Sequence, residues 1–435
     1  MSVIVFVITL TLIIGRPKGL GIGFSALGGA LLALATGVVT LDNIWEIRVI
    51  LGNTTFTLLT FLALRWILEK AGVFPWLAGL ISPRLFSNGR FLFIGFLLGS
   101  AIASFFLSNY GSLLLISAIA WELLTLLEFK PRTIFAFIVA IGFMSDWASL
   151  AFTSSNLINT IAASYAGINF SNFASVMLWV NGIAIVTGIG ILLFYFGRVI
   201  PLNYSQDKLI DGRENGIFEI PDVYPEIREI KTEETEEKKE DSHSLFYFDP
   251  MNGIVYTSQE MPHLRSANPA NLSKMKTLLK IVNNYPVLQI ILFFWGMSVI
   301  FIGLGNAGLT NSLSGILGQF GGWGTSLGVI FTGILITIQA SLMNNVPTIL
   351  SNMLAMQTTA ITNFNVINNL VYAAIIACVI GAKISPFGSL STLLLFDILQ
   401  QRGLNISWQD YFKMATVITL PVFFVSLLTL IIWLQ

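Results

Sequence analysis

The chain has 435 residues, of which 55% are hydrophobic and only 11% charged, and its 23 basic residues balance its 23 acidic ones. Soluble domains carry about 25% charged residues, so most of this chain cannot face water. The zero net charge gives no indication of nucleic-acid binding, and a single cysteine, Cys378, excludes an internal disulfide and a Cys-rich metal site. An integral membrane protein is the class that fits.

Apolar segments long enough to cross a bilayer follow one another along the chain. They lie at 2–15, 19–39, 49–68, 132–163, 172–198, 285–304, 364–400 and 407–434. No basic region precedes the first segment, and Arg16 and Lys18 follow it. We therefore expect a retained first span, not a cleaved signal peptide.

Two further stretches, 91–127 and 323–357, are too long for one span, and each has a polar break near its centre. The breaks read Ser108-Asn109-Tyr110-Gly111 and Asn344-Asn345-Val346-Pro347. Irregular backbone is not tolerated against lipid, so such breaks must line a cavity inside the protein. We predict a re-entrant helical hairpin in each stretch and a broken helix in each of 132–163 and 364–400. The expected fold class is an all-α membrane protein with about eight spans.

Charges in the connecting segments predict the orientation, because Lys and Arg are enriched on the cytoplasmic side. Arg16 and Lys18 place the loop after the first span inside, and therefore place the N-terminus outside. Counting the predicted spans onward from this loop puts the polar segment 201–282 in the cytoplasm as a linker. This segment has an acidic run around 233–241. The predicted outer loops near 305–322 and 359–363 carry no charge. We expect a multi-pass protein of the plasma membrane.

An internal repeat relates the two halves at one constant offset in residue number. Ala71-Gly72 recurs as Ala307-Gly308, and the same shift carries Asn109 onto Asn345. An odd number of spans separates equivalent points, which predicts an inverted repeat of the kind that builds secondary transporters. We predict a first transmembrane half at 1–200 and a second at 283–435. The second half lacks its first two spans, because the region where they would recur is polar.

Polar residues in the predicted hairpins and broken helices are the candidate substrate-binding residues, because polar groups at bilayer depth are costly. Small hydroxyl and amide side chains beside Gly and Pro suit broken helices whose ends point dipoles at a small polar solute. Helix packing by small residues also enriches Gly and Ser, but four clusters in repeat-related positions favour a binding site. The candidates are Ser108, Asn109, Gly111, Ser154, Ser155, Asn156, Asn344, Asn345, Pro347, Ser385, Gly388 and Ser389.

Asp146 and Lys383 lie near the centres of their apolar segments, at pseudo-equivalent breaks. A lone charge at the bilayer centre costs about 2.5–3.5 kcal/mol on insertion scales. We interpret Asp146 as a proton-coupling acid and Lys383 as its paired cation. The alternative is a purely structural salt bridge. We find no nucleophile–base pair, phosphate-binding glycine loop or metal-ligand spacing, so we expect neither an enzyme nor a cofactor or metal.

Several motifs are distinctive: RPKGLGIG at 16–23, SLMNNVPT at 341–348, KISPFGSL at 383–390, and Asp146 followed by Ala148-Ser149-Leu150 and Ser155-Asn156-Leu157. These motifs closely resemble those of the ArsB arsenite/antimonite efflux permeases. The resemblance covers nearly the whole chain outside 205–280. It implies the ion transporter superfamily fold, arsenite or antimonite as exported substrate, protons as counter-ion and a separate ArsA-type ATPase as a partner.

The chain also departs from that family pattern. Members generally have two further spans in place of the polar linker. Tyr110 stands where the first hairpin tip often has an acid, and Val379 and Ala382 stand where an acid and a proline often accompany the lysine. Asp146 is left as the main coupling candidate. The alternatives are a sodium/proton antiporter or other anion transporter of the same superfamily, or a homologue that has lost transport.

Overall fold

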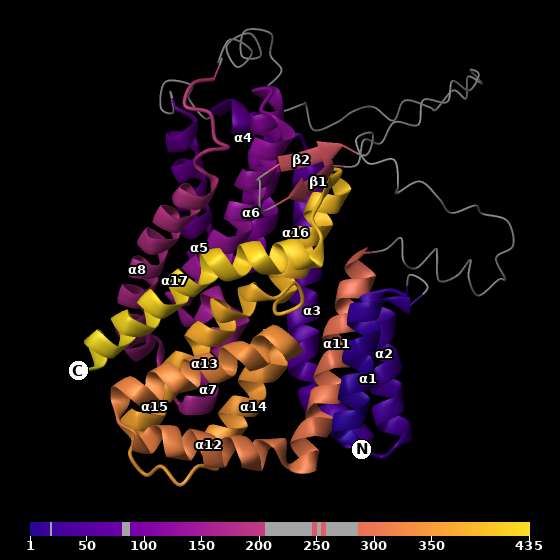
Figure 1. Ribbon diagram of the computed structural model, residues 1–435, viewed down its shortest axis with the longest axis vertical. Coiled ribbons are helices and arrows are strands. Elements are labelled where there is room, and N and C mark those ends of the chain that lie inside the picture. The colour runs from indigo at the N-terminus through magenta and orange to yellow at the C-terminus, as the bar shows by residue number, and fades with distance from the viewer. Residues whose placement is uncertain (18–19, 81–87, 205–245, 250–253, 258–285) are drawn as a thin grey trace, which may run out of the picture.

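The computed structural model describes residues 1–17, 20–80, 88–204, 246–249, 254–257 and 286–435. These residues are almost entirely helical (Figure 1). Eight helical stretches among them are long and apolar enough to cross a membrane, and α1 and α2 are shorter apolar helices. The all-α membrane class with about eight spans is confirmed.

Among the described residues, the first half of the chain contains eight α-helices. They are α1 (Ser2–Gly15), α2 (Ile22–Ala35), α3 (Leu41–Lys70), α4 (Val73–Leu80), α5 (Gly89–Leu126), α6 (Pro131–Trp147), α7 (Leu157–Ala166) and α8 (Phe170–Phe196). The second half contains α11 (Pro286–Leu304), α12 (Thr310–Gly322), α13 (Thr325–Met343), α14 (Asn345–Gln357), α15 (Phe364–Val379), α16 (Leu390–Gln401) and α17 (Trp408–Leu434). The long helices α8 and α17 pack against each other, and α1 and α2 pack on α11.

Side-chain caps fix where several of these helices begin. Thr40 accepts a hydrogen bond from the Asn43 backbone N–H, and the Asn43 side chain accepts one from the Thr40 N–H, which starts α3 with a capping box. Asn156 caps α7 and Ser389 caps α16 through their side chains, each after a break in the middle of a predicted broken helix. The cap residues therefore place helix ends inside the protein instead of at its surface.

The chain reverses direction within α5, at Ser108. Ser108 has φ 60° and ψ 170°, which is not helical. Residues twelve apart in a continuous helix would be separated by about 18 Å, yet the Ser112 hydroxyl donates to the Ser100 carbonyl oxygen at 2.7 Å. The two arms of α5 therefore lie side by side.

A second reversal occurs at Asn344, between α13 and α14. Asn344 has φ 77° and ψ 149°, and Asn352 of α14 donates to the Gln339 side chain of α13 at 2.8 Å. The repeat offset carries Ser108 onto Asn344, and it also carries Gly72 (φ 69°) onto Gly308 (φ 96°). Unusual backbone conformations thus recur at the offset of the sequence repeat. Re-entry into a bilayer and the inverted sense of the two halves stay predictions.

The stretch 305–322, expected to be an outer loop, is instead helical: a π-turn at Gly305–Leu309 leads into α12. The expectation rested on the place of this stretch between two apolar segments, 285–304 and 323–357, but a connection between spans can also form a short helix. Leu313 and Leu317 of α12 are buried, and the helix packs on α13 and α14. The short helix α4 also went unpredicted. Figure 1 shows α4 at the upper end of the molecule and α12 across the lower end.

Most of the predicted 201–282 linker lies outside the described residues. Within it, β1 (Phe246–Asp249) pairs antiparallel with β2 (Ile254–Thr257) and parallel with β3 (Leu404–Asn405) of the α16–α17 connection. No strands were predicted here from the sequence. Four-residue strands give too short a pattern to be recognised next to a charged run.

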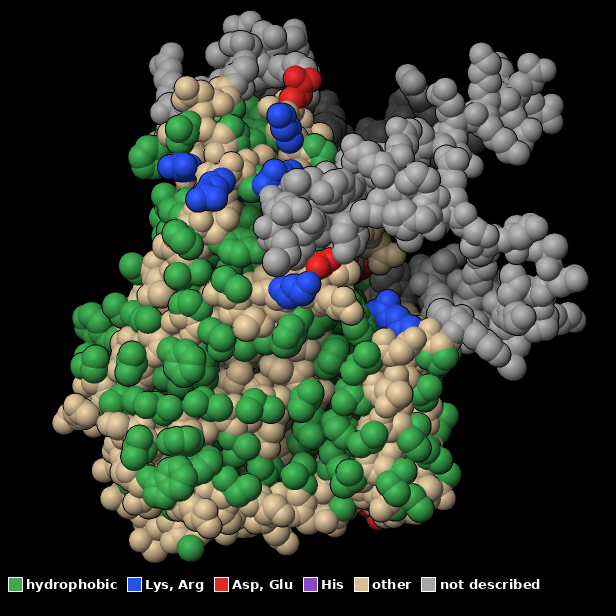
Figure 2. All heavy atoms as spheres, viewed as in Figure 1, with side chains coloured by type: hydrophobic (Ala, Val, Ile, Leu, Met, Phe, Trp, Pro, Cys, Tyr) green, Lys and Arg blue, Asp and Glu red, His purple; other side chains and the backbone are tan. Residues whose placement is uncertain are grey.

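Charged and apolar side chains are segregated on the surface. On the face shown in Figure 2, Lys and Arg side chains gather towards the end where α4 lies, and hydrophobic side chains cover the remainder. Large apolar side chains such as Phe106 (81% exposed), Phe194 (88%) and Ile432 (74%) project outward. A soluble protein would not leave so much apolar surface in water, whereas a membrane protein needs it against lipid.

Candidate functional site

The two broken helices bring Asp146 and Lys383 together. Asp146 lies in the last turn of α6, and Lys383 lies in the 3-10 turn that follows α15. The Lys383 Nζ is 2.9 Å from Asp146 Oδ2, and the side chains are 0% and 3% exposed, respectively. This ion pair joins the two halves of the chain and is closed off from solvent.

Two further donors complete the surroundings of the Asp146 carboxylate. Asn109 Nδ2, next to the reversal in α5, donates to Oδ1 at 2.8 Å. Ser391 Oγ, in the first turn of α16, donates to Oδ2 at 2.5 Å. The N-terminus of α16 also favours a nearby anion through its dipole, whereas the C-terminus of α6 gives no such support. Groups from three other segments thus contact the Asp146 carboxylate.

Lys383 is held by its backbone as well as by its ammonium group. Its Nζ donates to Ser391 Oγ at 3.3 Å and lies 5.6 Å from the centroid of the Phe143 ring. The Tyr411 hydroxyl donates to the Lys383 carbonyl oxygen at 3.0 Å. Sequence reasoning missed Phe143 and Tyr411. Neither belongs to a polar break, and the repeat-equivalent of Tyr411 in the first half is Ser175, so no repeat signal pointed to it.

A chain of hydroxyl groups leads away from the ion pair along the start of α16. Ser389 Oγ lies 2.9 Å from Ser391 Oγ and 2.9 Å from Thr392 Oγ1, and it also accepts from the Thr392 N–H at 3.2 Å. Hydroxyls both donate and accept, so this chain can reorient its protons without moving its heavy atoms. Such groups can hydrogen-bond a hydroxylated solute or pass a proton.

The second reversal contacts the second broken helix through its backbone. The Asn345 N–H donates to the Gly388 carbonyl oxygen at 2.8 Å, and Asn344 Nδ2 donates to the Phe387 carbonyl oxygen at 3.1 Å. Gly388 is needed at this contact, because a Cβ there would collide with the Ala382 carbonyl oxygen. Among the described residues, the side-chain oxygens of Asn109 and Asn345 and the Ser108 hydroxyl are buried without a hydrogen-bond partner. These three atoms therefore have unused hydrogen-bonding capacity.

Of the three predicted substrate-binding residues in the turn after Asp146, two support the site and one does not. Ser155 Oγ donates to the Ser149 carbonyl oxygen at 3.1 Å, and Asn156 Nδ2 donates to Ser149 Oγ at 2.8 Å, which fixes the turn after Asp146. Ser154 is exposed in that turn and takes no part in the cluster.

Three more candidates shape the backbone. A Cβ on Gly111 would strike the Phe61 ring, so this glycine lets α5 approach α3 closely. Ser385 Oγ accepts from the Phe387 N–H at 3.4 Å and holds the second turn. Pro347 is buried in the first turn of α14, where its missing N–H costs nothing.

A bundle of apolar helices that buries a carboxylate–amine pair between two broken helices has the fold and the site of a membrane transport protein.

Comparison with known proteins gives the family. The family model described as ArsB, arsenical pump membrane protein, matches residues 1–215 and 250–434. The chain is 36% identical over 435 residues to the arsenical pump membrane protein of Escherichia coli (strain K12), covering 98% of this chain and 97% of that protein. It is 34% identical over 432 residues to the one of Yersinia enterocolitica, with the same coverage, and 23% identical over 435 residues to the putative arsenical pump membrane protein of Bacillus subtilis (strain 168). The chain belongs to the ArsB family of membrane pumps.

Proposed function

We propose that this protein exports arsenite or antimonite across the plasma membrane in exchange for protons, with Asp146 as the group that exchanges the proton. The observation that carries this proposal is the Asp146 carboxylate, buried between both halves and held by Lys383, Asn109 and Ser391. The names of the relatives support an arsenical as the solute.

The chemistry of the solute matches the polar groups of the site. Trivalent arsenic bound as a thiolate complex needs several cysteines, and the chain has one, Cys378, which is buried. Arsenous acid in water is a neutral molecule with three hydroxyl groups. Hydroxyl and amide groups such as Ser389 Oγ and the unpartnered oxygens of Asn109 and Asn345 can hydrogen-bond it and still release it. We infer that the solute is carried as its hydroxide.

Competition between solute and proton for one carboxylate would couple their movements. An ionised Asp146 can accept hydrogen bonds from the hydroxyls of arsenous acid in place of those from Asn109 and Ser391. A proton on Asp146 removes acceptor capacity and weakens its attraction for Lys383. Solute and proton then bind alternately, which is the requirement of an antiporter. Each cycle carries one net positive charge inward, so the membrane potential contributes about 2.3 kcal/mol per 100 mV.

The proposed orientation puts the N-terminus outside and the 201–282 segment in the cytoplasm, in agreement with the position of Arg16, Arg90 and Arg132 in the sequence. The two hairpins and broken helices would move as a unit against the other spans to open the site to either side. A soluble ArsA-type ATPase, if present, would bind at the cytoplasmic face.

Arsenite uptake into inside-out membrane vesicles tests the proposal. We expect uptake that rises when a proton gradient, acidic inside, is imposed and that stops when the gradient is collapsed. Asp146→Asn keeps the size and the hydrogen-bonding shape of the side chain but cannot exchange a proton, so it should abolish gradient-driven uptake. Ser154→Ala, in the same turn region but exposed, is the matched control.

Three outcomes would contradict the proposal. Gradient-driven uptake that survives in Asp146→Asn would exclude this carboxylate as the coupling group. Uptake driven by a sodium gradient and indifferent to protons would favour a sodium-coupled transporter. Arsenite binding to the purified protein without any vesicle uptake would favour a homologue that has lost transport.

A further inference from the structure

A cavity of about 740 Å³ lies between the start of α5 and the end of α8. Arg90 and Phe91 of α5 line one side, and Phe194 of α8 with Arg198 just beyond that helix lines the other. No Asp or Glu of the described chain lines this cavity. Its volume falls within the range of about 300–1,000 Å³ that is usual for small-molecule sites. The cavity therefore combines positive charge with room for a ligand.

Close contacts hold the two sides of the cavity together. The Arg90 Nη2 donates to the Gly197 carbonyl oxygen at 3.3 Å, and the Gly89 N–H donates to the Leu202 carbonyl oxygen at 3.2 Å. A Cβ on Gly89 would collide with the Pro201 carbonyl oxygen, so glycine permits this close approach. The cavity is therefore fixed by the packing of the start of α5 on the end of α8.

The positive charges at this cavity are available to a ligand. Arg90 donates one hydrogen bond to Gly197 and is exposed to solvent. Arg198 is also exposed and has no ion pair in the part of the chain that the structure describes. The first turn of α5 adds the positive end of its helix dipole. Guanidinium groups match the paired oxygens of a phosphate in geometry, so the favoured ligand contains a phosphate or phosphodiester group.

Exposed aromatic side chains border the same cavity. Phe91 is 60% exposed and Phe194 is 88% exposed. Tyr195 lies half-buried beside them, and tyrosine favours the boundary between lipid and water. Both α5 and α8 are long and apolar enough to span a membrane, and the cavity lies at their ends. A soluble anion would gain nothing from exposed phenylalanine rings, whereas acyl chains would pack on them.

We infer that this cavity binds the headgroup of an anionic phospholipid, with the phosphate between Arg90 and Arg198 and the acyl chains along Phe91 and Phe194. Basic pockets between membrane helices suit lipid headgroups. An anionic lipid is preferred over phosphatidylcholine, because the choline group carries a positive charge that the two arginines repel. The inference goes beyond the proposed function, since it does not depend on the transported solute.

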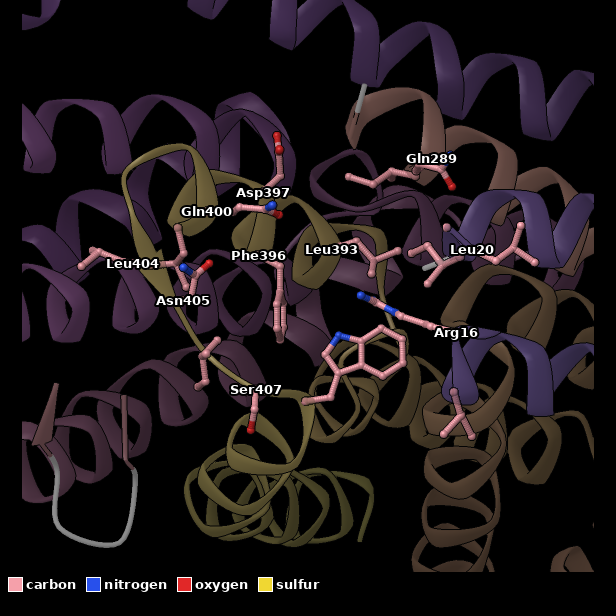
Figure 3. A pocket seen from close by; sticks show the side chains of 17 residues that line it. Arg16, Leu20, Gln289, Leu393, Phe396, Asp397, Gln400, Leu404, Asn405 and Ser407 are labelled. Atoms are coloured by element: carbon pink, nitrogen blue, oxygen red, sulfur yellow. The ribbon is translucent and has the colours of Figure 1, made fainter. Parts of the chain in front are cut away.

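A second cavity shows what a single arginine provides. It has a volume of about 670 Å³ and lies between the α1–α2 connection and the start of α17. Figure 3 shows the Arg16 side chain reaching into it, and the guanidinium carbon lies 4.0 Å from the centroid of the Trp408 ring. Of the described residues that line it, Arg16 is the one arginine. Because Arg16 is exposed like Arg198 and belongs to the same predicted membrane face, Arg16→Gln is the matched control.

Lipid binding to the purified full chain tests the inference. Native mass spectrometry in a mild non-ionic detergent counts the lipids that are retained when phosphatidylglycerol and phosphatidylcholine with the same acyl chains are added in equal amounts. We expect the parent chain to retain mainly phosphatidylglycerol. One arginine near an anionic headgroup gives about a fivefold preference, so Arg198→Gln should lower the ratio of the two lipids by about that factor. The double variant with Arg90→Gln should lose the preference, and Arg16→Gln should leave it unchanged.

Two further measurements separate a lipid site from a site for a free anion. An excess of inorganic phosphate should displace no more phosphatidylglycerol than sodium chloride of the same ionic strength does. Phe194→Ala should weaken the binding of both lipids to a similar extent, because it removes contacts to the acyl chains and leaves those to the headgroup. Specific displacement by phosphate would assign the cavity to a free anion and overturn the inference. Unchanged lipid binding in Phe194→Ala would also overturn it.

Equal retention of the two lipids by the parent chain would contradict the inference. Equal losses of preference in Arg16→Gln and Arg198→Gln would contradict it too, because the effect would then belong to the charge of the whole face. Arg198→Lys keeps the positive charge and should keep most of the preference. A preference that is lost in Arg198→Gln but kept in Arg198→Lys, with the same unfolding temperature in detergent, supports the site and excludes misfolding as the cause.

Discussion

The backbone reverses direction at both Ser108 and Asn344, but the asparagine that follows each reversal makes different contacts. At the first, the Asn109 side chain donates to the Asp146 carboxylate. At the second, Asn345 uses its backbone N–H on the Gly388 carbonyl oxygen and leaves its side-chain oxygen unpartnered. The repeat offset carries Asp146 onto Ala382, and it carries Trp147 onto Lys383. One half therefore supplies the acid and the other supplies the amine.

This difference indicates a division of tasks: two halves with similar backbone features contribute different chemical groups to one site. Both halves have a chain reversal and a helix start capped by a side chain, and these features place polar groups in the interior of the protein. Only the first half carries a carboxylate at that place. The second half contributes Lys383 and the hydroxyls of α16, which stabilise the charged acid and can contact a solute.

The largest loss of stability is expected when the ion pair between Asp146 and Lys383 is broken. Lys383→Met leaves the Asp146 carboxylate buried without its counter-ion, which costs about 3–5 kcal/mol of stability. The double variant with Asp146→Leu removes both charges and should recover most of that loss while remaining inactive in transport. Thermal unfolding in detergent, followed by tryptophan fluorescence, measures both. A single variant as stable as the parent chain would mean that Asp146 is already uncharged in the folded protein.

The two asparagines should respond unequally to removal of the side chain. Asn109→Ala deletes a hydrogen bond to a charged group, worth about 1.5–3 kcal/mol. Asn345→Ala keeps the backbone contact to Gly388 and deletes an oxygen that has no partner, so its unfolding free energy should change by less than about 1 kcal/mol. Its effect should instead be on the arsenite concentration that half-saturates vesicle uptake. Equal stability losses would contradict the division of tasks.

The reversals themselves should gain stability from glycine. Ser108 and Asn344 both have positive φ, a conformation that costs a residue with a side chain about 1–3 kcal/mol. Ser108→Gly should be stabilising by about 1–2 kcal/mol, because its hydroxyl has no partner. Asn344→Gly should gain less, since Asn344 also caps α14 and donates to Phe387. Denaturation of the two variants side by side measures the difference, and a larger gain at Asn344 would go against it.

Ser154→Ala should have the smallest effect. Ser154 is exposed beside a turn whose neighbours Ser155 and Asn156 are buried and hydrogen-bonded. Its loss should leave both stability and vesicle uptake within measurement error, as is usual for surface substitutions. A marked loss of uptake would return Ser154 to the site, where sequence reasoning had placed it.

Much of this arrangement could be predicted from the sequence, because a bilayer makes every buried polar group conspicuous. The breaks around Asn109 and Asn345, the isolated charges Asp146 and Lys383, and the offset that relates the two halves stand out against apolar surroundings. In the structure, the chain reverses direction at the two breaks predicted from the sequence. That Asp146 and Lys383 touch each other depends on the packing of the two halves, which no local pattern records.

The features that were not predicted do not differ in polarity from the residues around them in the sequence. Tyr411 reaches Lys383 from the start of a long apolar helix, and nothing in its neighbourhood marks it. The helix α12 was expected to be a loop because its residues fall between two predicted spans, although a connection between spans can also be helical. Arg16 was interpreted as an orientation signal, and only the three-dimensional structure shows that it also lines a cavity with residues of α16.

Transport current is the most direct test of the claim that Asp146 exchanges the proton. Proteoliposomes adsorbed on a solid-supported electrode receive a step in arsenite concentration, and the capacitive current reports net charge moved during exchange. We predict a transient current that reverses with the direction of the arsenite step in the parent chain and is absent in Asp146→Asn. A current of the same size in that variant would show that the proton is carried elsewhere, and the central role given to the Asp146–Lys383 pair would be wrong.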